Sequence, residues 1–169
     1  MDKEYTGSIC LGATRPSYDM ETDIEQSFDT SAITEAQIYA AVEKLTGTYE
    51  QTSPIFSALK IKGEPMYIKA RKGLAVEGKK RTITVHTFEI TNITMPYVHF
   101  RIVCSKGTYI RSIAYDLGQL LQNGGYLSSL RRTKIDKYDI DNAWQLNDLI
   151  AAIRNYNTTT GIDQNARFK

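Results

Sequence analysis

The stretch of the sequence best able to do chemistry runs from 104 to 111 and reads CSKGTYIR. We expect a strand to end at Cys104, Gly107 to allow a tight turn, and a helix to start at Thr108. Backbone amides in the first turn of a helix bind anions, and Lys106 adds a positive charge nearby. A purely structural junction is the alternative, because the glycine spacing of a P-loop is missing.

Arg111 would lie in the first turn of that helix, where the helix dipole disfavours a positive charge. An arginine placed against this preference indicates a task, such as pairing with a carboxylate or a phosphate group. An ordinary surface arginine is the alternative. Because the rest of that helix face is apolar, we favour a paired arginine at a functional site.

Positive charge gathers in one part of the chain, although the net charge is only +2. Residues 60–137 carry fifteen Lys and Arg against five Asp and Glu, whereas the remainder carries six basic and fourteen acidic residues. Within the basic part, 60–81 holds eight basic and two acidic residues, and 130–134 reads LRRTK. Such clusters contact the phosphate backbone of nucleic acids, RNA included. A solvated loop and a solvated strand face are the alternatives.

Other kinds of chemistry find little support in the residue pattern. The histidines, His86 and His99, lack partners at metal-ligand spacing, and Cys10 and Cys104 make neither a disulfide framework nor a metal set. No nucleophile elbow indicates Ser-His-Asp catalysis. We therefore expect no metal and a reducing, cytoplasmic compartment. We also expect no signal peptide and no membrane contact, because no apolar run approaches the roughly 20 residues of a membrane span.

The elements that must position these residues follow from hydrophobic periodicity and turn residues. Strands are predicted over 5–13, 53–60, 81–90, 97–104 and 127–138, with 81–90 and 97–104 forming an antiparallel pair. Helices are predicted over 34–45, 65–72, 108–121 and 146–154. The long polar connection over 14–31 is of a length that tends to be functional or disordered. Together these elements predict one mixed α/β unit of the α+β class.

Four segments, in this order, resemble motifs of the TruB family of bacterial tRNA pseudouridine synthases. They read YTGSICLGAT from Tyr5, SPIFSALK from Ser53, CSKGTYIR from Cys104 and LRRT from Leu130. Each motif alone is weak, and the four in series are specific. The resemblance implies a pseudouridine synthase fold, with a largely antiparallel central sheet flanked by helices and an RNA-binding insertion over 60–81.

The same resemblance implies an isomerase that needs no metal and no organic cofactor. Its partner would be the T stem-loop of tRNA, in which the uridine at position 55 becomes pseudouridine. Such an enzyme flips the target uridine out of the folded loop. An aspartate carboxylate then attacks, and the freed uracil rotates and rejoins the sugar through carbon.

The motif matches assign roles to individual residues. Tyr5 would stack on the flipped base, and Arg111 would pair with the catalytic aspartate and keep it ionised. Tyr109 and Leu130 would line the base pocket, and Asp19 would contact the substrate RNA. Further RNA contacts are expected from ten basic residues: Lys60, Lys62, Lys69, Arg71, Lys79, Lys80, Arg81, Lys106, Arg131 and Arg132.

The chain also departs from the family pattern. The catalytic aspartate of the family lies in a Gly-x-Leu-Asp-Pro segment upstream of the tyrosine motif, and no Leu-Asp-Pro occurs in these 169 residues. Asp116 does not easily replace it, because on an ideal helix it projects about 140° away from Arg111. Tyr126 stands where many relatives carry a histidine that contacts RNA.

These departures lead us to expect a fragment. Residues 1–155 would be the C-terminal part of a catalytic domain and 156–169 a polar tail, with no PUA module. Without the nucleophile, the chain alone is expected to be inactive. The alternative is a non-catalytic RNA-binding module that kept the fold. A phosphate-metabolite enzyme using the 106–108 turn is a third, minor possibility.

Overall fold

The computed structural model describes residues 1–54, 60–61, 64–65 and 78–160. Contacts between elements divide the chain into two compact units, Met1–Lys137 and Tyr138–Lys169. Each unit is described by itself below. The expected organisation, a domain over 1–155 and a polar tail over 156–169, stays a prediction.

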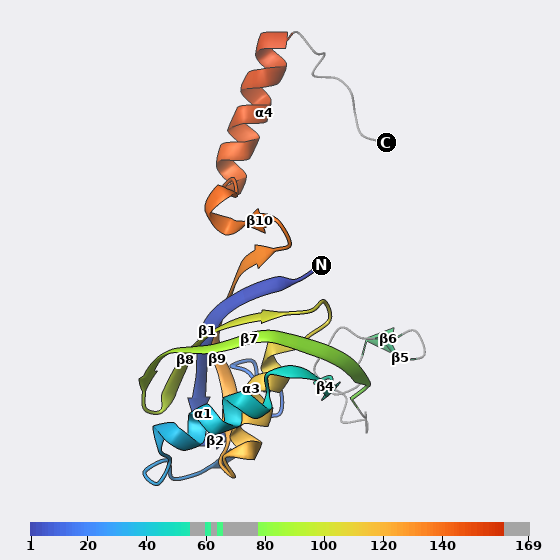
Figure 1. The fold of residues 1–169 in the computed structure, drawn as a ribbon. Coiled ribbons are helices and arrows are strands. Elements are labelled where there is room, and N and C mark those ends of the chain that lie inside the picture. The colour runs from blue at the N-terminus through green and yellow to red at the C-terminus, as the bar shows by residue number, and fades with distance from the viewer. Residues whose placement is uncertain (55–59, 62–63, 66–77, 161–169) are drawn as a thin grey trace. The chain divides into compact units, whose positions relative to one another are not determined.

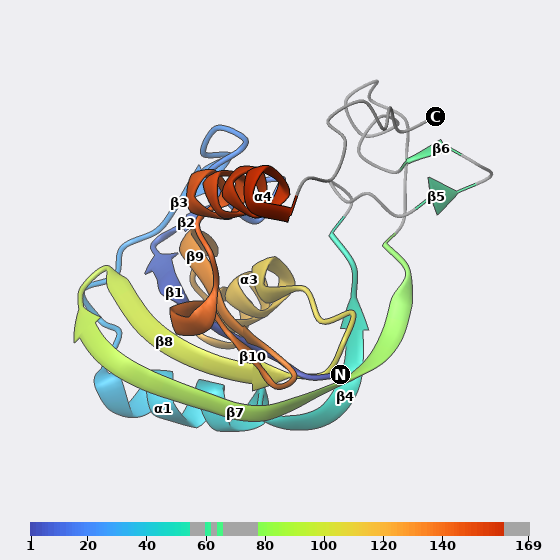
Figure 2. The ribbon, with the colours of Figure 1, turned by 90° about the horizontal axis from the view of Figure 1, so that it is seen from above.

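The first unit is built on an antiparallel sheet (Figures 1 and 2). Its strands lie in the order β9-β1-β8-β7-β4, so that the N-terminal strand is inserted between two strands from the second half of the unit. The strand bounds are β1 Lys3–Leu11, β4 Gly47–Thr52, β7 Lys80–Thr94, β8 Tyr97–Cys104 and β9 Gly125–Ile135. Two short antiparallel pairs complete the described strands of this unit, β2 Ala13–Thr14 with β3 Gln26–Ser27 and β5 Lys60–Ile61 with β6 Glu64–Pro65.

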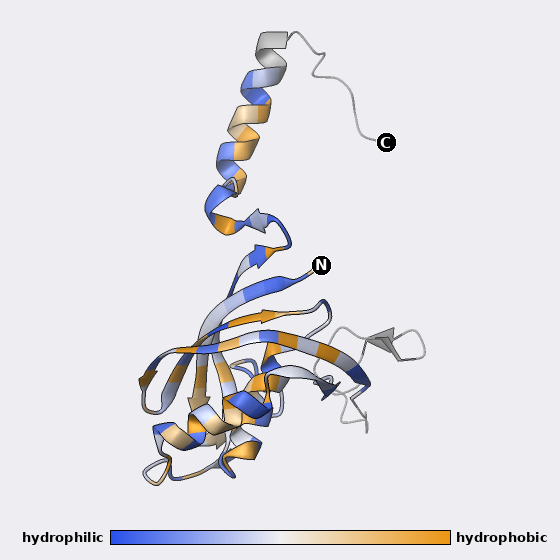
Figure 3. Ribbon diagram, in the orientation of Figure 1, coloured by the Kyte–Doolittle hydropathy of each residue, from blue (hydrophilic) through white to orange (hydrophobic). Residues whose placement is uncertain are grey.

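The sheet forms because its strands alternate apolar and polar residues. In β8, every second side chain from Val98 to Cys104 is buried, and the residues between them are partly exposed. Figure 3 shows the same alternation of hydrophobic and hydrophilic residues along β7 and β8. These two strands pair antiparallel through the turn after Thr94, which confirms the predicted pair. The α+β class and the antiparallel sheet are confirmed as well.

Two helices contribute to the hydrophobic core that covers this sheet, α1 (Glu35–Lys44) and α3 (Ile110–Leu120). Thr34 caps α1 through a capping box with Gln37, which confirms the helix start read from the sequence. Gly118 lets α3 approach β9 closely, because a Cβ atom there would lie 2.3 Å from the backbone nitrogen of Gly125. The helix that carries Arg111 is therefore fixed directly against the sheet.

Some element predictions for this unit differ from the structure, and others fall on residues that the structure does not describe. Strand β4 has no counterpart among the predicted elements. Of the strand expected over 53–60, Ser53 and Pro54 lie outside any strand and Lys60 lies in β5. The Ser53 amide still donates to the Lys79 carbonyl, but Pro54 has no amide with which to continue the ladder. Residues 55–59 lie outside the described residues, as does the helix expected over 65–72 apart from Pro65. Helix α3 begins at Ile110 rather than Thr108, because the Thr108 hydroxyl donates to the Ser105 carbonyl at 2.9 Å and closes a turn.

The second unit contains β10 (Tyr138–Asp139), a 3-10 helix (Ile140–Asn142) and α4 (Leu146–Thr160). Helix α4 continues past the predicted end at Arg154, since no glycine or proline interrupts it before Gly161. In the part of the chain that the structure describes, no helix has the length and apolar character needed to cross a membrane.

Candidate active site

A hollow of about 400 Å³ brings together three of the residues singled out in the sequence. Asp19, Arg111 and Leu130 all line it, although they come from a loop, from α3 and from β9. Its other lining residues are Met20, Glu21, Leu127, Ser128 and Ser129. The exposed area of its walls is mainly apolar, and the charged groups of Asp19 and Arg111 meet in its lining. Apolar walls with a small number of placed polar groups are usual in small-ligand sites.

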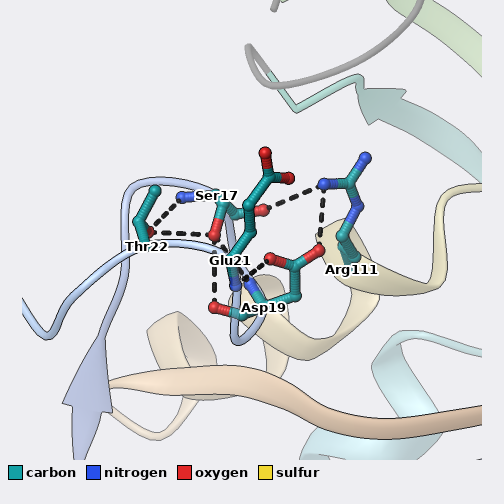
Figure 4. A network of polar contacts seen from close by, with 5 residues as sticks. All are labelled: Ser17, Asp19, Glu21, Thr22 and Arg111. Carbon is teal, nitrogen blue, oxygen red and sulfur yellow. Dashed lines mark hydrogen bonds and ion pairs between the residues drawn. The ribbon is translucent and has the colours of Figure 1, made fainter. Parts of the chain in front are cut away.

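The charged centre of this hollow is an ion pair. The Arg111 guanidinium donates to the Asp19 carboxylate at 3.0 Å and to the Ser17 carbonyl at 3.5 Å, as Figure 4 shows. Both side chains are largely shielded, with 22% of Arg111 and 24% of Asp19 exposed. A pair this protected from solvent is screened less by salt than a surface pair. Of the two kinds of partner expected for Arg111, a carboxylate or a phosphate group, the structure shows a carboxylate, that of Asp19. The pairing with a catalytic aspartate stays a prediction.

The loop that presents Asp19 is ordered by its own polar contacts (Figure 4). Ser17 is fully buried, and its hydroxyl lies 2.9 Å from the Thr22 hydroxyl and 3.2 Å from the Asp19 carbonyl. The Asp19 carboxylate also accepts the Glu21 amide at 2.9 Å. One Asp19 oxygen is therefore bound by its own loop and the other by Arg111, which fixes the orientation of the carboxylate.

Tyr18 docks this loop onto α3 and β9. Its ring stacks on Tyr115 with centroids 4.1 Å apart, and its carbonyl accepts the Leu127 amide at 2.9 Å. The backbone at Tyr18 has φ of 64°, a left-handed conformation that costs free energy outside glycine. Strain of this kind persists only when surrounding contacts hold it, and it occurs often at functional sites.

Tyr5 lies in β1 on the same sheet face as Leu130. The register pairs Tyr5 with Arg132 and Gly7 with Leu130, and cross-strand partners project to one face. Tyr5 does not line the hollow itself. Burial raises the pKa of its hydroxyl, and the neighbouring Arg132 guanidinium opposes this shift. The Tyr5 side chain is therefore protonated near neutral pH.

Tyr109 is also absent from the lining and lies at the start of α3 instead. The Arg81 guanidinium lies 5.4 Å from the centre of its ring, within the range of a cation–π contact. Its backbone amide donates to Gln51 at 2.8 Å. One amide of the expected anion site is therefore already engaged by the protein.

Comparison with known proteins shows the family to which the chain belongs. Residues 1–110 match the model of the TruB family pseudouridylate synthase N-terminal domain. Residues 111–166 match the model of the tRNA pseudouridylate synthase B C-terminal domain. The chain belongs to the TruB family.

Bacterial TruB proteins are among the similar sequences. The chain is 52% identical over 141 residues to tRNA pseudouridine synthase B of Flavobacterium johnsoniae, covering 83% of this chain and 62% of that protein. It is 44% identical over 154 residues to the protein of the same name from Chloroherpeton thalassium, covering 90% of this chain and 64% of that protein. The chain thus spans less than two thirds of the length of these TruB relatives.

Solved structures share the fold of this TruB chain. A chain of a Cbf5-Nop10-Gar1 complex superposes with a TM-score of 0.65 at 24% sequence identity, covering 96% of this chain and 39% of that one. A chain of an H/ACA RNP bound to a substrate RNA containing 2′-deoxyuridine gives 0.60 at 22% identity, covering 96% and 37%. This likeness supports a pseudouridine synthase fold.

The basic residues expected to contact RNA fall into three groups in this TruB chain. Arg131 and Arg132 are exposed on β9, and Lys106 is exposed in the turn before α3. Lys79 and Lys80 are exposed at the start of β7, where Arg81 is held by Tyr109 and donates to the Gly107 carbonyl at 3.4 Å. Lys60 lies in β5, and Lys62, Lys69 and Arg71 lie outside the described residues.

Sequence reasoning missed several residues of the hollow and of the loop beside it. Ser17 and Thr22 hold the loop, and Ser128 and Ser129 line the hollow. The Ser17-x-Asp19 spacing is a signal for local side-chain to backbone bonding and could have indicated an ordered loop. Among the described residues, no group of three or more His, Cys, Asp or Glu side chains is arranged to hold a metal ion.

Proposed function

We propose that the gene product containing this chain is a tRNA pseudouridine synthase of the TruB type that converts a T-loop uridine of tRNA to pseudouridine. The reaction breaks the glycosidic bond between C1′ and N1, joins C1′ to C5 of uracil, and releases the C5 proton to solvent while N1 takes up a proton, so that the product is an isomer of uridine. We propose that it needs neither metal nor organic cofactor. A tRNA substrate would place the protein in the cytoplasm.

The observation that carries this proposal is the hollow shared by Asp19, Arg111 and Leu130. Three residues to which the resemblance gives a role meet there from distant parts of the chain: Arg111 in catalysis, Leu130 in the base pocket and Asp19 in RNA contact. Its volume of about 400 Å³ is within the range of pockets that hold a small ligand. A flipped uridine would enter with Leu130 against the base and Arg111 beside the reacting sugar, while Tyr5 stacks from β1.

Arg111 would orient and keep ionised the carboxylate that attacks the uridine. Its guanidinium is already aimed by Asp19 and Ser17, so its geometry does not depend on substrate. A donor fixed in advance stabilises developing charge without the cost of reorganisation. In the family pattern the attacking aspartate belongs to a Gly-x-Leu-Asp-Pro segment, which these 169 residues do not contain.

Release of tritium from tRNA transcripts containing 5-tritiated uridine tests the proposed activity. The gene product should release one tritium per target uridine, because the C5 position loses its hydrogen when the new C–C bond forms. A transcript with cytidine at the T-loop position is the control and should release none. The 169-residue chain alone should release none either. If the gene product releases no tritium, the proposed synthase activity is refuted.

A non-catalytic RNA-binding module is the second candidate, favoured by the exposed basic residues on β9 and before α3. It would bind T-loop hairpins without releasing tritium. Both candidates share the proposal that RNA is the partner.

Exposed arginines of β9 test the RNA contact. Replacing Arg131 and Arg132 together by alanine should weaken binding of a T-loop hairpin and lower the slope of log K against log salt by about 0.7–0.9 for each lost phosphate contact. Fluorescence anisotropy over a salt series measures this slope. Glu50→Gln, on the exposed side of β4, changes charge away from β9 and is the control. An unchanged slope in the double variant would exclude these arginines from the RNA contact.

A further inference from the structure

We propose that Gln51 is a positioning residue that holds the first turn of α3, and through it Arg111, in working orientation. This inference rests on the proposed function of the hollow, and it concerns a residue outside that hollow. Gln51 lies in β4, sixty positions before Arg111 in the sequence.

Gln51 makes a paired contact with the backbone of a single residue. Its side-chain amide donates to the Tyr109 carbonyl at 3.0 Å, and its side-chain carbonyl accepts the Tyr109 amide at 2.8 Å. Only 1% of Gln51 is exposed. Two opposed hydrogen bonds between one planar amide and one backbone residue restrain both the position and the rotation of that residue.

The start of α3 lacks the usual means of stabilisation. Tyr109 is its N-cap and offers no side-chain capping bond, and the first turn contains no acidic residue. Arg111 occupies that turn against the helix dipole. The restraint that a capping side chain would normally supply is instead supplied from β4.

A second contact from β4 completes the attachment. The Ser112 hydroxyl donates to the Thr52 carbonyl at 2.8 Å, so that neighbouring β4 residues hold the positions on both sides of Arg111. The other end of the Arg111 side chain is held by Asp19 and Ser17. The helix turn that carries Arg111 is thus anchored by β4 through Tyr109 and Ser112, and the Arg111 guanidinium is held by the loop.

A shift of the helix start would therefore move the guanidinium relative to the reacting atoms. Misplacement by about 1 Å can cost on the order of 10²-fold in rate. A purely structural glutamine would affect stability and leave kcat unchanged. The two roles are separated by comparing kcat, KM and local backbone exchange in matched variants.

Gln51→Glu removes only the donor, because a carboxylate still accepts the Tyr109 amide but cannot donate to the Tyr109 carbonyl. Protonation of the introduced carboxyl restores a donor. We expect kcat about tenfold below wild type at pH 8, a KM for tRNA within threefold, and a ratio to wild type that recovers as the pH falls. Gln51→Met removes both hydrogen bonds, so its kcat should stay below that of wild type at every pH.

Asn123→Asp is the matched control. Asn123 is 8% exposed, and its amide donates to the Asp29 carbonyl at 2.8 Å, so this change also deletes one buried amide donor to a backbone carbonyl. It should lower the melting temperature without lowering kcat. Equal kcat in Gln51→Glu and Asn123→Asp, or a ratio to wild type that does not change with pH, would overturn the positioning role.

Amide hydrogen exchange across 106–113 gives a readout that does not depend on activity. In the gene product, Gln51→Met should exchange faster in this segment than wild type, and Asn123→Asp should not. If wild type releases no tritium, the proposed function fails, while the exchange result still decides whether Gln51 holds α3. Unchanged exchange in Gln51→Met would refute that role. If the methionine variant does not fold, exchange across 106–113 in Gln51→Glu, compared with wild type at two pH values, provides the same test.

Discussion

Arg111→Ala in the gene product is expected to lower kcat for tritium release by on the order of 10²–10³-fold while the Kd for tRNA stays within a few-fold. Arg111 is the one lining residue of the hollow that carries a positive charge, among the residues that the structure describes. Its guanidinium donates to the Asp19 carboxylate at 3.0 Å, which fixes its direction. It is also mostly shielded from water, and a charge acts more strongly in such a low-dielectric site than in solvent. Removing it deletes an interaction that matters most as charge develops.

Single-turnover tritium release and filter binding of the same tRNA measure the two quantities. Arg131→Ala is the control, because it removes the same charge from an exposed position on β9. Arg131→Ala should weaken tRNA binding and leave the single-turnover rate constant at saturating enzyme near that of wild type. A near-normal kcat in Arg111→Ala would remove Arg111 from the reaction.

Asp19→Asn adds a test of the ion pair itself. If Asp19 acts by aiming Arg111, the loss in the double variant should be smaller than the sum of the two single losses, expressed as free energies. Additive losses would show that the two residues act independently. Such independence would be compatible with a separate contact of Asp19 to RNA.

The partner of Arg111 shows how far the sequence alone can lead. A positive charge in the first turn of a helix predicts a carboxylate or phosphate partner from electrostatics, and the structure supplies Asp19. The pattern does not tell which acid, because the pair joins residues 92 positions apart. That choice depends on how the loop over 15–22 packs against α3, through the stacked rings of Tyr18 and Tyr115.

Local rules predicted the elements whose signals are contained within them. The capping box at Thr34 and the alternation in β8 are of this kind. Strand β4 has no such signal, because its sequence, GTYEQT, has little hydrophobic alternation. Its one buried polar residue, Gln51, is buried because its side chain bonds the Tyr109 backbone. A buried amide with a long-range backbone partner leaves no local pattern.

Asp116 carries the second large effect, this time on stability. Burial raises the pKa of its carboxyl to about 6. Burial raises the pKa of the Tyr18 hydroxyl, to about 12, and that of the Tyr49 hydroxyl. The nearby charge of Asp116 raises both further, so neither tyrosine stabilises an ionised Asp116. The Tyr49 hydroxyl is itself buried, and no described residue offers it a hydrogen bond. Ionised Asp116 is therefore poorly compensated.

The sign of the effect follows from proton binding. An unfolded aspartate has a pKa of about 3.9, and folded Asp116 has one of about 6. Between these values the folded state binds more protons, so stability falls as the pH rises from about 4 to above 6 and then levels off. Two pKa units correspond to about 3 kcal/mol as an upper limit, and water penetration into a partly exposed site reduces this to about 2 kcal/mol.

Asp116→Asn should therefore stabilise the protein near pH 8 and give no gain near pH 4. At pH 8 we expect a rise in Tm of about 4–8 °C, from a gain of about 2 kcal/mol in a domain of this size. Differential scanning calorimetry of both proteins at the two pH values measures the change. Glu50→Gln, an exposed carboxylate on β4, should show no such pH-dependent difference. An equal shift in Tm at both pH values would mean that the asparagine acts through packing, and that the charge of Asp116 does not destabilise α3.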